Sequence, residues 1–462
     1  KNERIQKLNG FKFEKVGDNL NQFYKNSLPF ELTGDQKKVI KEIRNDFRDG
    51  KQMNRLLQGD VGSGKTIVSI MIMLIAIDNN FQSCILAPTE ILANQHFKSI
   101  KELLSGLDIK IDILTGSVKT KDRKVIHEDL LSGKTNILVG THAILEDIVK
   151  FKNLGLSIVD EQHRFGVAQR AKLWEKNSPP PHVLVMTATP IPRTLAMSLY
   201  GDLDISSIKE LPPGRITTKT VHKYDKNRLS VFKFLREQIK KGRQIYLVYP
   251  LINESEKLDY KDLMDGYESI VREFPRPDFQ VSIVHGKMSS KDKDYEMGRF
   301  INKETQILVS TTVIEVGVNV PNASVMVIES AERFGLSQLH QLRGRVGRGN
   351  EESYCILMTK DNLSEDSKIR VDTMVKVSDG FKLAEVDLKL RGPGDMMGTK
   401  QSGALKFKLA DIIYDSEILN NARKCAYKLL ESDPRLTKKE NYPIRHEISS
   451  SSNSKNLWRY IS

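Results

Sequence analysis

Short apolar runs alternate with longer helix-like stretches through most of the chain. From residue 55 onward the runs are rich in aliphatic and β-branched residues, and each ends close to Gly, Thr, Asp or Pro. The first series consists of RLLQ, SCILA, KIDIL, NILVG, LSIVD and HVLVM. This alternation is typical of a parallel sheet whose strands are connected by crossover helices.

A second series of the same kind follows a break in the pattern. The break is SSIKELPPGR, residues 206–215, where Pro-Pro-Gly continues neither a helix nor a central strand and predicts a linker. The later runs are TKTVH, RQIYLVYP, FQVSIVHG, QILVST, SVMVIES and YCILMT. The chain is therefore predicted to be an α/β protein with two tandem domains, each built on a parallel sheet.

Two further segments stand apart from this pattern. The charged, helix-like stretch between Ile252 and Phe279 is predicted to be a surface excursion. Beyond Thr359 the strand-like runs stop, and two helical stretches flank Asp379 and Gly380 before the glycine-rich loop RGPGDMMGTKQSG. We therefore expect a helical hairpin and a C-terminal region after the two sheets.

Length and composition agree with an ordinary globular chain of two or three domains. The chain has 462 residues, of which 39% are hydrophobic and 28% are charged, enough for a sizeable core. Its 72 Lys and Arg against 59 Asp and Glu give a net charge of +13. Such an excess indicates attraction to a polyanion, and a merely basic surface is the alternative.

The cysteines and the longest apolar stretch argue against several classes of protein. Cys84, Cys355 and Cys425 lack the paired spacing of a zinc site or a redox motif, which predicts buried, reduced thiols. The run IVSIMIMLIAI, residues 67–77, is too short to span a bilayer, so we expect a cytoplasmic protein without a membrane partner. The chain begins at Lys1 inside a charged, helix-like segment, and is expected to be a fragment of a longer protein.

The sequence GDVGSGKT, residues 59–66, lies between an apolar run and an apolar helix. Its glycines allow backbone N–H groups to point at phosphate oxygens beside a helix N-terminus, and its flanks supply the context that a chance match would lack. Lys65 would reach the β and γ phosphates of a nucleotide, and Thr66 would give its hydroxyl to Mg²⁺. The predicted phosphate-binding residues are Gly59, Gly62, Ser63, Gly64, Lys65 and Thr66.

A later strand ends in two adjacent acids, Asp160 and Glu161, within LGLSIVDEQHRFG. A strand that ends beside the phosphate loop would present both acids to the same cavity. Asp160 is predicted to hold Mg²⁺ through a water, and Glu161 to orient and deprotonate the water that attacks the γ-phosphate. Gln162 and His163 follow at a spacing suited to sensing that phosphate. The alternative is that the two acids merely begin a solvated turn.

An arginine-rich stretch in the second series is expected to complete this site. QLRGRVGRG, residues 341–349, is predicted to bring Gln341, Arg345 and Arg348 together on one face of a helix. Guanidinium groups from a second domain stabilise transition-state charge only when the cleft closes, which would link closure to hydrolysis. The alternative, a solvated basic face, is disfavoured by the glycines within the stretch.

With these motifs the chain resembles superfamily 2 helicases, and among them the bacterial branched-DNA helicases. The match extends from about Leu28 to Gly403. The segments that carry it are LPFELTGDQ, APTEILANQH, LTGS, GTHA, TATPIPRTLA, VHGKM, STTVIEVGVNVPNA and QLHQLRGRVGRG. The resemblance implies two RecA-like domains with ATP and Mg²⁺ in the cleft between them, Gln36 recognising the adenine, and nucleic acid across the top of both sheets.

The resemblance also implies a division of the chain and an activity. The expected regions are 1–29, a linker from a missing upstream wedge domain; 30–204, the ATP-binding first RecA-like domain; 205–360, the second; and 361–462, a translocation hairpin with a C-terminal region. The implied activity is that of an ATP-dependent DNA helicase that moves along duplex DNA and acts on stalled forks and Holliday junctions in recombination and repair. The family also suggests a monomer, with single-strand-binding protein as a partner.

Some residue roles and rival functions remain open within this resemblance. Arg391 and Gln401, in the late glycine-rich loop, are the expected coupling residues, and Asn319 stands where the family commonly has an aspartate. Transcription-repair coupling translocases share HRFGV and TATPIPRTL, whereas DEQH, LPPGR and IEVG favour the branched-DNA helicases. An RNA helicase is a second rival, and a nucleotide-gated scaffold that holds branched DNA without efficient hydrolysis is a third.

Overall fold

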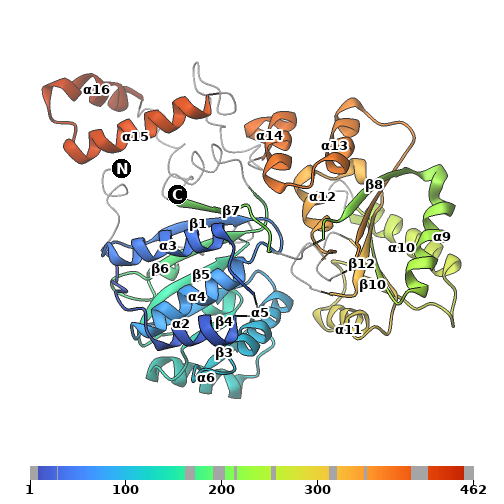
Figure 1. Cartoon of the computed structure of the whole chain (residues 1–462), viewed down its shortest axis with the longest axis horizontal. Coiled ribbons are helices and arrows are strands. Elements are labelled where there is room, and N and C mark those ends of the chain that lie inside the picture. The colour runs from blue at the N-terminus through green and yellow to red at the C-terminus, as the bar shows by residue number, and fades with distance from the viewer. Residues whose placement is uncertain are drawn as a thin grey trace.

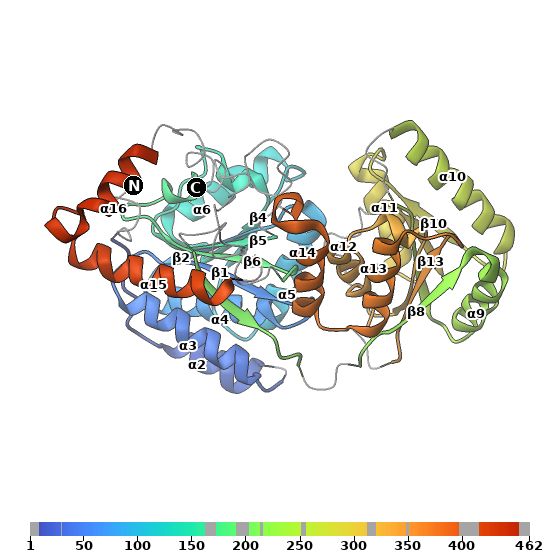
Figure 2. The same ribbon diagram turned by 90° about the horizontal axis from the view of Figure 1, so that it is seen from above.

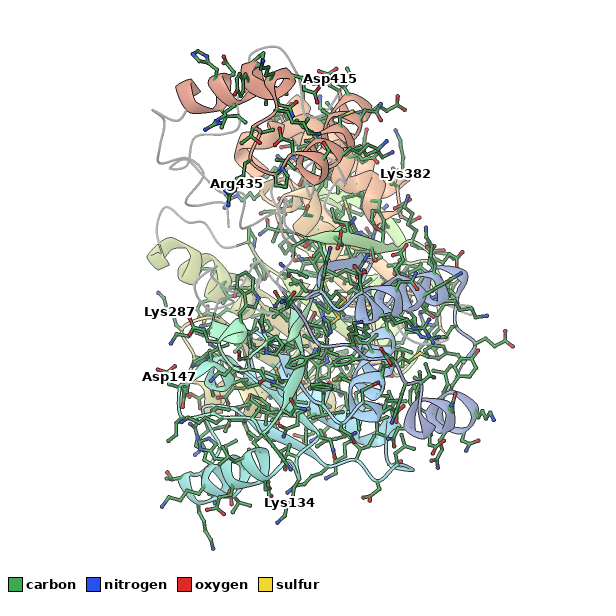
Figure 3. The ribbon with its side chains drawn as sticks, turned by 90° about the vertical axis from the view of Figure 1, so that its left-hand side faces the viewer. Lys134, Asp147, Lys287, Lys382, Asp415 and Arg435 are labelled. Atoms are coloured by element: carbon green, nitrogen blue, oxygen red, sulfur yellow. The ribbon has the colours of Figure 1, made fainter. Side chains whose placement is uncertain are left out.

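The computed structural model consists mainly of two parallel β-sheets flanked by helices (Figure 1). The structure describes residues 9–28, 30–161, 172–190, 203–212, 216–250, 256–311, 320–347, 351–396 and 415–451. The two sheets lie beside each other along the long axis of the molecule. Charged side chains such as those of Lys134 and Asp147 lie at the periphery (Figure 3).

The first sheet contains seven parallel strands within the described residues, in the order β3-β4-β2-β5-β6-β1-β7. The strands are β1 (Asn54–Gly59), β2 (Gln82–Leu86), β3 (Ile111–Leu114), β4 (Ile137–Gly140), β5 (Leu154–Asp160), β6 (His182–Thr187) and β7 (Asp204–Ile208). The central strands are buried along almost their whole length, as parallel strands between layers of helices must be. The carboxyl ends of β5, β6 and β1 therefore lie side by side at one edge of the sheet.

The second sheet contains six parallel strands in the described part of the chain, in the order β10-β11-β9-β12-β13-β8. The strands are β8 (Lys219–Tyr224), β9 (Gln244–Val248), β10 (Val281–Val284), β11 (Ile307–Ser310), β12 (Ala323–Ile328) and β13 (Tyr354–Thr359). Its buried apolar strands agree with the same rule.

Helices flank both sheets and continue beyond the second. Those of the first domain are α2 (Asp18–Gln22), the π-helix η1 (Phe23–Ser27), α3 (Gly34–Arg48), α4 (Lys65–Asp78), α5 (Glu90–Leu103), α6 (Thr120–Ser132) and η2 (His142–Leu145). Those that follow are η4 (Asp225–Asn227), α9 (Arg228–Lys240), α10 (Glu256–Glu273), α11 (Ser290–Ile301), η6 (Ala331–Arg333), α12 (Leu336–Arg343), α13 (Glu365–Lys376), α14 (Gly380–Met396), α15 (Ser416–Ser432), η7 (Lys439–Asn441) and α16 (Tyr442–Ser451). Helices α12, α13 and α14 pack together at the junction of the two sheets (Figure 2).

The predicted fold class is confirmed, with one strand that the pattern did not predict. Every apolar run expected to be a strand forms one, and α13 and α14 form the expected helical hairpin. Strand β7 crosses the predicted boundary at residue 204 and takes up the start of the predicted linker 206–215. Its sequence DISSI contains no apolar run, because it pairs only with β1 at the edge of the sheet. The last strand of the first sheet along the chain thus ends at Ile208.

The stretch between Ile252 and Phe279 was predicted to be a surface excursion, and this prediction is wrong. Helix α10, within that stretch, packs into the core of the second domain. Leu263, Ile270 and Phe274 are buried in one cluster with residues of the second sheet. Leu263 and Ile270 lie seven residues apart on one face of α10, and Phe274 follows directly after the last residue of the helix. The many charges on the other face hid that period in the sequence.

Residues 9–28 pack onto the first domain, whereas the sequence predicted that residues 1–29 are only a linker. The backbone N–H of Phe13 donates to the carbonyl oxygen of Phe47 at 3.0 Å. The Phe13 ring lies 4.9 Å from that of Phe81, between ring centroids. The carboxylate of Asp78 accepts hydrogen bonds from backbone N–H groups at the start of α2. Irregularly spaced phenylalanines, without a strand or helix period, concealed this packing.

The cysteines are only partly as predicted. Cys84 and Cys355 are buried, whereas Cys425 is exposed on α15, because it lies on the solvent-facing side of an amphipathic helix. Across the described ranges, no helix combines the length and the apolar character needed to cross a membrane.

His182 lies beneath the N-terminal segment. Its Nδ1 accepts a hydrogen bond from the backbone N–H of Met53 at 2.9 Å, so Nε2 carries the hydrogen and donates it to the carbonyl oxygen of Phe11, also at 2.9 Å. Burial lowers the pKa of His182 to about 4, and the hydrogen bond to Phe11 opposes this shift only in part. The folded chain therefore holds this histidine in its neutral form.

Lowering the pH is expected to destabilise the chain through His182. The folded-state pKa of about 4 is below the ordinary value of 6.5, so the unfolded chain binds a proton that the folded chain does not. The free energy of unfolding should therefore decrease as the pH falls from about 6.5 to about 4, by about 2 kcal/mol between pH 7 and pH 5. Chemical denaturation at the two pH values measures this decrease.

The variant His182→Gln is the control, because its amide does not titrate. The decrease in the free energy of unfolding between pH 7 and pH 5 should be about 2 kcal/mol smaller in this variant than in the parent chain. The same pH dependence in the variant and in the parent chain would contradict the assignment.

Candidate functional site

The loop between β1 and α4 has the geometry of a phosphate cradle. Gly59 ends β1, Gly62 lies in the turn, and Gly64 precedes α4 with a φ of +87°, a left-handed conformation that favours glycine. A Cβ atom at Gly64 would lie 2.2 Å from Nε2 of Gln36, so a side chain at this position would displace the Gln36 amide. The N-terminus of α4 that follows favours anions through its backbone N–H groups and helix dipole.

Lys65 and Ser63 lie within this loop and fit a phosphate ligand. Nζ of Lys65 donates hydrogen bonds to the carbonyl oxygens of Gly59 at 2.7 Å and Asp60 at 3.0 Å, which hold the ammonium group against the loop. The hydroxyl of Ser63 is buried without a hydrogen-bond partner in the described part of the chain. Such a group is unfavourable unless a ligand satisfies it. Thr66 follows, half-buried, in the first turn of α4.

Gln36 connects the start of α3 to the phosphate loop. Its backbone N–H donates to Oγ1 of Thr33 at 3.3 Å, and its Oε1 accepts from the backbone N–H of Thr33 at 2.9 Å, which forms a capping box. Its Nε2 donates to the carbonyl oxygen of Ser63 at 2.9 Å. The structure thus brings Gln36 to the loop, and its contact with an adenine stays a prediction.

Strand β5 ends at the acidic pair. Asp160 is buried, and its Oδ2 lies 2.8 Å from Nε2 of His96 on α5. Glu161 has a φ of +52°, which is a strained conformation for a residue with a side chain. Its Oε2 accepts a hydrogen bond from the backbone N–H of Ala188, after β6, at 3.4 Å. His96 was not among the predicted site residues, although it is the last residue of the motif APTEILANQH.

The two acids have pKa values that move in opposite directions. Burial raises the pKa of Asp160, but the hydrogen bond and charge of His96 and the charge of Lys65 outweigh burial and bring this pKa below its ordinary value. Burial and the nearby charge of Asp160 raise the pKa of Glu161. Asp160 therefore stays ionised, as a metal ligand must, while Glu161 accepts a proton more readily, as a general base must.

The second domain contributes residues from the end of α12. Gln341 is buried within α12, which ends at Arg343, and Arg345 is buried just beyond the helix. Gln341 and Arg345 therefore do not share a helical face as expected, because Gly344 caps the helix and Gly347 is left-handed with φ +80°. Arg345 still approaches the acidic pair, since its charge opposes the increase that burial causes in the pKa of Glu161.

Several predicted residues lie outside the part of the chain that the structure describes. They are Gln162, His163, Asn319, Arg348 and Gln401. Arg391 lies in α14, and its side chain is also outside the described part of the structure. Their roles stay predictions.

Direct contacts join the second domain to the phosphate loop. Gly344 lies so close to the loop that a Cβ atom there would be 2.8 Å from Cβ of Val61. Nε2 of His340 lies 2.5 Å from Oδ1 of Asp60. Burial raises the pKa of Asp60, but the hydrogen bond and charge of His340 outweigh burial and lower it overall. Neither Asp60 nor His340 was predicted as a site residue, although they lie inside GDVGSGKT and QLHQLRGRVGRG.

The fold and the phosphate loop place the chain in the class of proteins that have two RecA-like domains. Residues 33–198 match the DEAD/DEAH box helicase family, and residues 230–350 match the helicase conserved C-terminal domain. Residues 377–462 match the C-terminal part of domain 3 of ATP-dependent DNA helicase RecG. The chain belongs to the RecG family.

Individual relatives agree with this assignment. The chain is 48% identical to ATP-dependent DNA helicase RecG of Synechocystis sp. over 94% of the chain and 52% of that relative. It is 50% identical to RecG of Bacillus subtilis over 91% of the chain and 61% of that relative. A solved structure of RecG bound to a three-way DNA junction superposes with a TM-score of 0.74 at 43% identity, over 89% of this chain and 53% of that one. The chain thus spans about half the length of these relatives.

Alanine at position 64 is expected to destabilise the first domain. The variant Gly64→Ala would place a methyl group in a left-handed backbone and against Gln36. The backbone strain alone costs about 1–2 kcal/mol, and the collision adds to it. The free energy of unfolding in urea measures the loss.

The variant Gly298→Ala is the matched control for this substitution. Gly298 lies inside α11, and a Cβ atom there meets nothing within 4 Å. Alanine should therefore stabilise the chain by about 1 kcal/mol. If the two substitutions changed the free energy of unfolding equally, the account of Gly64 would be wrong.

Proposed function

We propose that this chain is an ATP-dependent DNA motor that moves along duplex DNA and remodels branched DNA, such as stalled forks and Holliday junctions. The observation that carries the proposal is the proximity of three features: the phosphate loop, the acidic pair at the end of β5, and the buried Arg345 from the second domain. Family membership supports the use of ATP.

The proposed roles in the first domain follow from charge and position. The phosphates of ATP would lie in the loop of residues 59–66, with Lys65 turned from the loop carbonyls toward them. Thr66 and Asp160 would hold Mg²⁺, which neutralises phosphate charge when bound. Glu161 would take the proton of the attacking water, a role that its raised pKa supports.

The second domain would add positive charge to that of Lys65 in the first domain. Arg345 and Arg348 would stabilise the negative charge that develops on the transferred phosphoryl group, and Gln341 would help to orient it. Because Gly344 and His340 already contact the phosphate loop, small movements of the loop would displace residues of the second domain. Hydrolysis would in this way drive opening and closing of the cleft.

DNA is the proposed polyanionic partner. The net charge of +13 favours a nucleic acid, and the solved RecG structure is of a complex with a three-way DNA junction. Binding that depends on phosphate contacts weakens steeply with added salt. The preference for branched DNA over linear duplex is part of the proposal.

ATP turnover of the parent chain beside Glu161→Gln tests this function. Turnover is measured with single-stranded DNA, linear duplex, a model fork, a four-way junction and RNA. DNA should stimulate the parent chain, most strongly when branched, and the variant should be slower by about 100-fold or more, because it lacks the general base. Nucleotide binding by the variant, measured separately, controls for misfolding.

Each contrary outcome corresponds to a rival function. Stimulation by linear duplex without a preference for branches would favour a translocase of the transcription-repair coupling type. Stimulation by RNA alone would favour an RNA helicase. Binding of branched DNA without any stimulated turnover would favour a nucleotide-gated scaffold and would contradict the motor.

Alanine at position 344 is expected to slow hydrolysis by holding the domains apart. The methyl group of Gly344→Ala would lie 2.8 Å from Cβ of Val61, closer than two carbon atoms approach without a shift. Overpacking of this kind costs about 1–3 kcal/mol, which corresponds to a loss of turnover between about fivefold and about 160-fold. Steady-state ATP turnover measures the loss.

A second substitution tests the cause of that loss. The variant Val61→Gly in the background of Gly344→Ala removes the colliding atoms and should restore part of the turnover. Full activity of Gly344→Ala, or no recovery in the double variant, would argue against a steric origin.

A further inference from the structure

The imidazole of His96 lies on a face of α5 that is otherwise apolar. The buried residues of this helix are Leu92, Ala93, His96 and Ile100, and their helical spacing directs them into the core of the first domain. His96 is 7% exposed. A buried polar group is unfavourable unless it forms a hydrogen bond. The ring therefore needs a partner at this position, and Asp160 is that partner.

The start of α5 is fixed by its cap and by both domains. Oγ1 of Thr89 accepts a hydrogen bond from the backbone N–H of Leu92 at 3.3 Å, which caps the helix. Ile91, in the first turn, packs against the core cluster of the second domain. Strand β2, which leads into α5, pairs with β5 so that Leu86 lies opposite Val159. A rotation of α5 that moved the imidazole would therefore break contacts with both domains.

Hydrogen bonds hold both carboxylate oxygens of Asp160. Oδ2 lies 2.8 Å from Nε2 of His96, and Oδ1 accepts a hydrogen bond from the backbone N–H of Glu161 at 3.1 Å. An ionised carboxylate only accepts hydrogen bonds, so Nε2 of His96 carries the hydrogen and donates it. Such a carboxylate offers about four lone-pair positions, and these two contacts use only part of them. Asp160 thus has a fixed orientation and still has acceptor capacity for a further ligand.

A carboxylate of fixed orientation favours some cations over others. Mg²⁺ requires nearly ideal octahedral geometry, whereas Ca²⁺ accepts a variable number of oxygen ligands in a flexible arrangement. Groups that orient a ligating side chain without touching the metal commonly raise metal affinity by about 10- to 100-fold. Loss of the hydrogen bond to Asp160 should therefore weaken binding of Mg²⁺ more than binding of Ca²⁺.

We propose that His96 is a positioning residue that fixes the carboxylate of Asp160 for the divalent cation of the nucleotide, and that it gives the site a preference for Mg²⁺ over Ca²⁺. The inference rests on the proposed function, because it needs a nucleotide and its cation beside Asp160. His96 acts through one hydrogen bond and needs no contact with the cation or with the nucleotide.

Binding of a fluorescent, non-hydrolysable ATP analogue to the full chain tests this role without any turnover. The analogue is titrated with MgCl₂ and, separately, with CaCl₂. The variant His96→Asn has a side chain too short to reach Asp160. It should raise the Mg²⁺ concentration needed for half-maximal binding by about 10- to 100-fold. The Ca²⁺ requirement should rise by about threefold or less, because Ca²⁺ tolerates a mobile ligand.

Three further variants complete the design. His96→Gln places an amide N–H near the position of the imidazole Nε2, so its Mg²⁺ requirement should stay within about threefold of that of the parent chain. His96→Leu fills the space without a donor, should show the same loss as His96→Asn, and replaces it if that variant does not fold. His127→Asn is the matched control, because His127 is a half-buried histidine of α6 whose Nε2 has no hydrogen-bond partner among the residues described. It should leave both cation requirements unchanged.

The outcomes separate this inference from the proposed function. An unchanged Mg²⁺ requirement in folded His96→Asn or His96→Leu would overturn the role of His96. Equal losses in His96→Gln and His96→Asn would also overturn it, since the hydrogen bond would then not be the cause. Equal losses for Mg²⁺ and Ca²⁺ would overturn the preference between cations. A parent chain that binds the analogue without any divalent cation would contradict the proposed Mg²⁺ site itself, and the role of His96 would fall with it.

Discussion

The phosphate loop is restrained from three directions, and the arrangement of both domains depends on this restraint. Gln36 holds the loop from α3 by a hydrogen bond to the carbonyl oxygen of Ser63. Lys65 holds it from within, and His340 and Gly344 contact it from the second domain. A ligand that competes for any of these contacts must alter the others, because packed interiors transmit small displacements.

The acidic pair shows how neighbouring groups divide two roles between similar side chains. Asp160 and Glu161 are adjacent, and both are carboxylates in a largely buried setting. His96 and Lys65 stabilise the charged form of Asp160, whereas burial and the charge of Asp160 destabilise the charged form of Glu161. Desolvation affects both acids, so the hydrogen-bond partner decides which pKa falls. Residues on a different helix therefore set the chemistry of the strand end.

The hairpin helices connect this chemistry to the outer part of the molecule. Residues at the C-terminal end of helix α12 contact the phosphate loop, and the helix packs against α13 and α14 (Figure 2). One helix thus contacts both the phosphate loop and the hairpin. Three consecutive contacts lead from the phosphate loop to the turn between α13 and α14.

The local pattern of the sequence was sufficient for most of the fold, and it predicted the candidate site. Apolar runs separated by helix-like stretches predict parallel strands, and GDVGSGKT predicts a phosphate loop, because both depend on the local order of residue types. Strand β7 and the segment 9–28, which lack such local periodicity, were missed, and the burial of the helix-like stretch that forms α10 was misjudged. Their burial depends on neighbours that are distant in the sequence.

The residues of the site divide in the same way. The sequence alone determined that Lys65, Asp160 and Glu161 lie close together, since the ends of parallel strands meet at one edge of a sheet. Only the tertiary structure decided that His96 and His340 are the partners of two of the carboxylates, because those contacts join residues 64 and 280 positions apart. No local pattern encodes a contact whose geometry depends on how helices and domains pack.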